Sequence, residues 1–127
     1  MDDKDLHDRG LKLRMEMFGR DAVEKRMNAF GDFGKPLQHI INAYAYGDVW
    51  QRTALPAATK SLVMIAMMAA AKQPNELAVH LRGALKNGCT PEQIQEVLLL
   101  LTLYCGIPSG IDAHRIATDV LREHSGV

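Results

Sequence analysis

Two stretches of this chain are too apolar to form the surface helices of a small monomer. Residues 62–71 are apolar on every helical face. Residues 94–105 place apolar side chains at helical spacing but carry leucines on their other faces as well. A chain of 127 residues has little other structure with which to cover both stretches. We therefore expect part of this apolar surface to lie in an interface between subunits.

Proline and glycine divide the chain into helices. Prolines stand where a first helical turn tolerates a missing N–H, and Thr90-Pro91-Glu92-Gln93 has the pattern of a capping box. No stretch combines period-two alternation with β-branched enrichment. We therefore expect one all-α domain over residues 1–127, with six to seven helices. The predicted helices cover residues 2–18, 21–30 (capped by Asp21), 36–46, 56–73, 74–86, 91–105 and 111–124, with breaks at 31–35 and 106–110 and a loop at 48–53.

Charge and hydropathy exclude two classes of partner. Fifteen basic and fifteen acidic residues leave no net charge, so the chain lacks the broad positive field of a nucleic-acid binder. The longest apolar run, residues 62–71, is much shorter than the roughly 20 residues that span a bilayer, and the acidic start of the chain is not typical of a secretory signal. We expect a cytoplasmic protein with no membrane or nucleic-acid partner.

The cysteines and histidines do not form a metal-binding pattern. Cys89 and Cys105 lie sixteen residues apart with no Cys-x-x-Cys and no zinc-finger spacing to a histidine, so free thiols are expected. No Gly-rich phosphate loop and no nucleophile elbow is present. The sequence predicts neither a metal nor a cofactor.

Glu76 and His80 are the first candidates for chemistry. They stand four residues apart in the predicted helix 74–86, so the carboxylate can orient the imidazole as a proton-transfer site requires. The alternative is structural. Glu76 would then stabilise the positive end of the helix dipole, and His80 would cover a helix surface.

Arg52 and Lys60 flank the start of the helix predicted from residue 56, where free backbone N–H groups already favour anions. Together they could hold the carboxylate of a small-molecule ligand, although isolated cations at such places are commonly solvated. Trp50, and Tyr46 with it, could wall the same pocket or anchor core packing.

From residue 44 to residue 108 the chain resembles the carboxymuconolactone decarboxylase family, which belongs to the alkylhydroperoxidase D-like superfamily. Where the alkylhydroperoxidase branch carries Cys-x-x-Cys-x-x-x-His, this chain has Gln73-Pro74-Asn75-Glu76 followed by His80, so a dithiol mechanism cannot run there. The family usually has a tryptophan at Tyr46, an arginine at Lys60 and a proline at Thr53. The matching stretches are residues 46–52, 60–66, 76–88, 91–97 and 104–108.

The resemblance implies an all-helical subunit in a homo-oligomer, commonly a hexamer built as a trimer of dimers. It also implies cofactor-independent loss of CO₂ from γ-carboxymuconolactone or a related lactone acid, as in the β-ketoadipate pathway of aromatic degradation. On this reading His80 donates the proton and Glu76 orients it, while Arg52 and Lys60 hold substrate carboxylates and Trp50 and Tyr46 wall the site.

Two other functions remain open at this stage. One is a thiol-dependent peroxide or disulfide reductase that uses Cys89 and Cys105, which requires their Cα atoms to approach to about 4.4–6.8 Å. The other is a non-catalytic oligomeric binding protein on the same scaffold.

Overall fold

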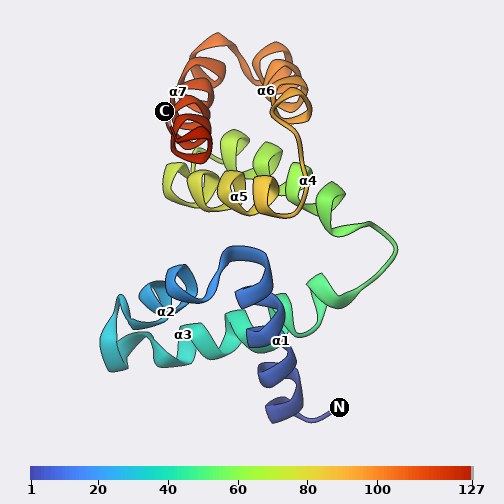
Figure 1. The fold of residues 1–127 in the computed structure, drawn as a ribbon, viewed down its shortest axis with the longest axis vertical. Helices are drawn as coiled ribbons and strands as arrows, with labels where there is room; N and C mark the ends of the chain where they lie inside the picture. Colours follow the sequence, from blue (N-terminus) through green and yellow to red (C-terminus); the bar gives the residue numbers. More distant parts are fainter. Residues whose placement is uncertain (127) are drawn as a thin grey trace. The chain divides into compact units, whose positions relative to one another are not determined.

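The computed structural model describes residues 1–126, and every regular element in that range is helical (Figure 1). The all-α prediction is therefore confirmed. The chain forms two compact units, Met1–Leu55 and Pro56–Val127. No helix within residues 1–126 is long and apolar enough to cross a membrane.

The first unit is built on a close crossing between its first helix and a later wide turn. Its elements are α1 (Asp3–Phe18), α2 (Arg20–Asn28), the 3₁₀ turn η1 (Gly31–Gly34), α3 (Lys35–Ile40), the π-helical turn η2 (Ile41–Tyr46) and the 3₁₀ turn η3 (Val49–Gln51). Gly10 and Gly47 make the α1–η2 crossing possible. A Cβ on Gly10 would overlap the Asn42 carbonyl oxygen, and one on Gly47 would overlap the Leu6 carbonyl oxygen.

The buried polar groups of this unit join α1 to α3 and to η2. Arg14 is 5% exposed and donates to the side-chain oxygens of Gln38 and Asn42, at 2.8 and 3.0 Å. A buried guanidinium must keep such partners, because an unpaired one costs several kcal/mol. These bonds therefore hold the α1–η2 crossing in one register.

The second unit packs two helical pairs around one core. It contains α4 (Ala57–Ala70), α5 (Pro74–Lys86), α6 (Pro91–Cys105) and α7 (Ile107–Ser125), and α6 and α7 lie side by side against α4 and α5 (Figure 1). Arg82 Nε on α5 donates to Glu123 Oε2 on α7 at 2.7 Å. The largest core side chains, each at most 1% exposed, are Ile65, Leu77, Leu81, Ile94 and Leu98.

The capping box at the start of α6 is confirmed in both directions. Gln93 N donates to Thr90 Oγ1 at 3.1 Å, and Thr90 N donates to Gln93 Oε1 at 2.9 Å. Pro91 occupies the first helical position, where its missing N–H costs nothing.

The starts of two helices differ from the prediction. α7 begins at Ile107, not Ile111, because Gly106 alone turns the chain at φ 104° and Pro108 is tolerated in the first turn. α2 begins at Arg20, with Gly19 rather than Asp21 at its N-cap.

Two segments predicted to be irregular form short helical turns. The predicted break around Gly31 and Gly34 is the turn η1, and the predicted loop at 48–53 contains η3. The helix predicted over 36–46 is α-helical only to Ile40 and widens into η2. Turns of three or four residues carry no periodicity that a sequence pattern could reveal.

The predicted excess of apolar surface is present on α4 and α6. Val63 and Met67 on α4 are both more than 40% exposed. On α6 and the start of α7, Leu99, Leu100 and Leu103 line one hollow, while Leu99, Ile107 and Ile111 line another. We call these five side chains the α6–α7 patch; each is 53–74% exposed.

Candidate functional site

α5 carries the two residues predicted to transfer a proton. Glu76 is exposed in the first turn, and His80 one turn later is only 6% exposed. His80 therefore does not merely cover a helix surface, as the structural alternative supposed. It lies in the stretch of α5 that also carries the fully buried Leu77 and Leu81, so its imidazole is largely shielded from bulk water.

Lys60 lies on the helix next to α5. It is half-buried in the first turn of α4, which has no side-chain cap. The adjacent Ser61 is 2% exposed and accepts a hydrogen bond from Asn87 Nδ2 at 3.4 Å, so the start of α4 meets the end of α5. His80 precedes Asn87 by seven residues, a rise of about 10 Å. Lys60 and His80 therefore lie on neighbouring helices, separated by about 10 Å along the α5 axis.

Tyr46, Trp50 and Arg52 belong to the first unit. The Tyr46 and Trp50 rings stack with centroids 5.8 Å apart and planes at 18°. Tyr46 is 7% exposed, and its ring also lies perpendicular to that of Phe18, so it is a packing residue, whereas Trp50 is only half-buried. Arg52 is exposed, with Nη2 3.5 Å from Asp48 Oδ1.

The structure thus places the six predicted residues in two groups. Tyr46 and Trp50 are in contact within the first unit, which also carries the exposed Arg52. Lys60 lies on α4 of the second unit, and Glu76 and His80 lie on the adjacent α5. The joining of these groups in one substrate cavity stays a prediction.

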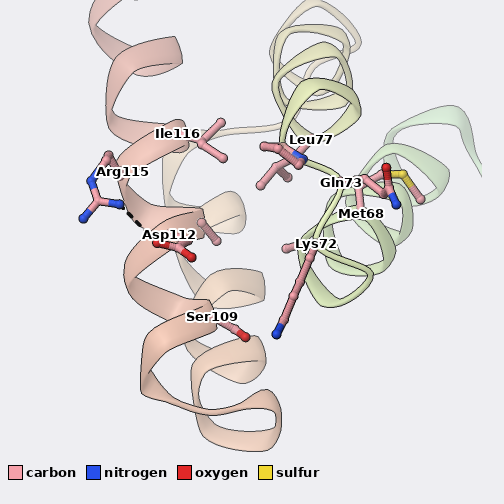
Figure 2. Close-up of a pocket in the computed structure, with 11 residues that line it drawn as sticks. Met68, Lys72, Gln73, Leu77, Ser109, Asp112, Arg115 and Ile116 are labelled. Carbon is pink, nitrogen blue, oxygen red and sulfur yellow. Dashed lines mark hydrogen bonds and ion pairs between the residues drawn. The ribbon is translucent and has the colours of Figure 1, made fainter.

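A separate hollow of about 340 Å³ lies where α4 ends, α5 begins and α7 passes both (Figure 2). None of the six predicted site residues lines it. The sequence did not predict that the polar residues in the lining of this hollow would form a site. These residues are Lys72, Gln73, Ser109, Asp112 and Arg115. One local signal was present: no glycine stands between the apolar run at residues 62–71 and Pro74, so another residue must make the turn between the two helices.

The two cysteines are too far apart for the thiol alternative to operate within one chain. Cys89 precedes α6 and Cys105 is its last residue. The fourteen steps from Pro91 to Cys105 rise about 21 Å, whereas a disulfide needs Cα atoms within about 7 Å. Both thiols are free. Among residues 1–126, no cluster of three or more histidine, cysteine or carboxylate side chains is arranged to hold a metal.

Thiol labelling should separate the two cysteines. Burial raises the pKa of the Cys89 thiol, and its Sγ donates to the Ala58 carbonyl at 3.3 Å, so little nucleophilic thiolate forms at neutral pH. Cys105 is exposed. With a maleimide at pH 7 we expect one fast-reacting thiol per chain, lost in Cys105→Ser, and a slow one that accelerates as the pH rises. Equal rates for both thiols would contradict this assignment.

The fold and α5 together define a class: an all-helical subunit with a buried histidine in the middle of one helix and no dithiol beside it. Comparison with known proteins makes the assignment specific. The chain belongs to the carboxymuconolactone decarboxylase family, whose model matches residues 35–119.

Two relatives are similar over most of their length. The chain is 35% identical to 4-carboxymuconolactone decarboxylase of Acinetobacter baylyi over 97% of this chain and 92% of that protein. It is 38% identical to nitrosuccinic acid decarboxylase npaB of Metarhizium robertsii over 85% of this chain and 76% of that protein. Both are named decarboxylases, and together with the family they support a carboxy-lyase activity for this chain.

Proposed function

We propose that this protein decarboxylates γ-carboxymuconolactone or a related acid without a cofactor, with His80 as the proton donor. The observation that carries the proposal is the burial of His80 on α5, within the region that matches the decarboxylase family. Exclusion of bulk water strengthens the interactions that position an imidazole against one reacting carbon.

The substrate class follows from the group that accepts the electron pair left behind by the departing CO₂. In γ-carboxymuconolactone the departing carboxylate is conjugated through a double bond to the lactone carbonyl, which accepts the electron pair as a dienolate. In nitrosuccinic acid a carboxylate and a nitro group share one carbon, and the nitro group accepts the pair as a nitronate. Each acid keeps a second carboxylate. We infer that the substrate is a dicarboxylate. One of its carboxylates is placed so that the electron pair left by CO₂ passes to an electron-accepting group, either directly or through a double bond.

The catalytic steps need only side chains of this chain. Arg52 and Lys60 bind the substrate carboxylates, and Glu76 orients the imidazole of His80. Trp50 lines the substrate ring, and the stacked Tyr46 supports Trp50 from behind. Loss of CO₂ leaves an electron pair on the acceptor group, and His80 then delivers one proton to carbon. A positioned general acid of this kind contributes roughly 10²–10⁴-fold.

The active form is proposed to be a homo-oligomer, a hexamer or a trimer. The α6–α7 patch supports this, because five large apolar side chains at 53–74% exposure form more apolar surface than a single subunit usually leaves in water.

Incubation with candidate acids tests the activity directly. We expect the purified protein, without added metal or cofactor, to release one CO₂ per γ-carboxymuconolactone or nitrosuccinate consumed. In D₂O the product should carry one deuteron on the carbon that takes the proton. Binding of both acids without CO₂ release would instead favour the non-catalytic binding protein. Turnover that needs an added metal would contradict the cofactor-independent reaction.

A further inference from the structure

The hollow at the end of α4 is a second candidate site, built entirely within the second unit. Its walls are mainly apolar: Leu77 and Ile116 point toward each other across it (Figure 2), and Met68 also lines it. A volume of about 340 Å³ lies in the range of small-molecule pockets, roughly 300–1,000 Å³. It can hold one small organic molecule whose body is apolar.

Lys72, on the rim of this hollow, has an unfavourable backbone conformation. Its φ is 58°, and every other positive φ in residues 1–126 belongs to a glycine. Gln73 N donates to Met68 O at 2.9 Å and Lys72 N to Ala69 O at 3.2 Å, so Lys72 occupies the position after α4 where glycine is normally preferred. A side chain with a Cβ costs free energy in this conformation. Lysine is therefore less favourable for the backbone at this position than glycine would be.

The Lys72 side chain extends from this turn along the hollow toward Ser109 (Figure 2). Asp112 is the one carboxylate in the lining, and its Oδ1 already accepts from Arg115 Nη1 at 3.1 Å. Lys72, Arg115 and Asp112 together give the rim a net charge of +1. Because Asp112 is already paired with Arg115, the ammonium group of Lys72 can attract an anion.

We propose that this hollow binds a small monocarboxylate with an apolar body, whose carboxylate contacts the Lys72 ammonium and the Ser109 hydroxyl. The apolar body packs against Met68, Leu77 and Ile116. The proposal does not depend on decarboxylation, since His80, Glu76 and Lys60 do not line the hollow.

Three probes that share one ring test the proposal: benzoate, benzamide and benzylamine. Titrations of the full chain, labelled with ¹³C at methionine methyl groups, follow the Met68 signal, assigned with Met68→Leu. We expect benzoate to shift this signal saturably and to bind about tenfold more tightly than benzamide, as a charge-assisted hydrogen bond provides. Benzylamine should bind no better than benzamide. Equal binding of benzoate and benzamide, tighter binding of benzylamine, or no binding of any probe would overturn the proposal.

Lys72→Gly distinguishes an effect on ligand binding from an effect on the stability of the fold. Glycine relieves the positive φ, so the thermal midpoint should stay the same or rise while the benzoate affinity falls to that of benzamide. Lys72→Arg should keep most of the benzoate affinity. His80→Gln should leave the Met68 response to benzoate intact, which distinguishes this site from the proposed catalytic one. Unchanged benzoate affinity in Lys72→Gly would contradict the role of the lysine.

Discussion

His80→Gln is expected to lower kcat for decarboxylation by about 10²–10⁴-fold without unfolding the protein. Glutamine is polar and similar in length, so it can keep a hydrogen bond in a position that is only 6% exposed. It cannot donate a proton to carbon, because its amide is far too weak an acid at neutral pH. Steady-state turnover should be compared with far-UV circular dichroism and size-exclusion chromatography on the same sample.

His124→Gln is the matched control for this substitution. His124 is exposed near the end of α7, so the same chemical change should leave turnover within about twofold and stability within about 0.5 kcal/mol. A His80→Gln protein that is folded and retains wild-type turnover would remove His80 from the mechanism. The Met68 response to benzoate would be unaffected by that result.

The ends of helices can be predicted from sequence where they depend on a capping hydrogen bond between nearby residues or on a glycine that adopts a positive φ. Thr90 and Gln93 exchange two bonds across four residues, and Gly19 and Gly106 adopt φ near +90 to +100°, so each is decided within one turn of chain. The start of α7 was misplaced because proline is compatible both with a break and with a first turn. The structure shows the first-turn case: Gly110 is buried, and a Cβ on it would overlap the Thr102 side chain, so this part of α7 packs closely against α6.

The sequence predicts which residues could form the candidate site, but it does not predict which of their side chains are buried. Spacing placed Glu76 and His80 one turn apart, but it did not predict that one would be exposed and the other buried, since that depends on which face of α5 the core covers. Tyr46 is a second example: an aromatic residue at this position of the sequence could either line a pocket or pack in the core, and in the structure it is 7% exposed. Lys72 was missed because a positive φ at lysine is set by the turn around it.

The second large effect is expected at the α6–α7 patch, where Leu103→Glu should break the proposed homo-oligomer into smaller species. Leu103 is 74% exposed in the single chain, so the substitution should change the stability of an isolated subunit by only about 0.5 kcal/mol. In an interface the same carboxylate would be buried without a partner, which costs several kcal/mol per site. Sedimentation velocity across a concentration series measures the shift.

Leu55→Glu is the matched control, because it makes the same change at a leucine that is 48% exposed and lies outside the patch. It should sediment as the wild type does. If Leu103→Glu also sediments as the wild type, the α6–α7 patch is not the interface. If Leu103→Glu dissociates and loses turnover together, while His80→Gln loses turnover and stays assembled, the active site depends on the neighbouring subunit. In that case the apolar excess on α6 is a requirement of the chemistry as well as of the assembly.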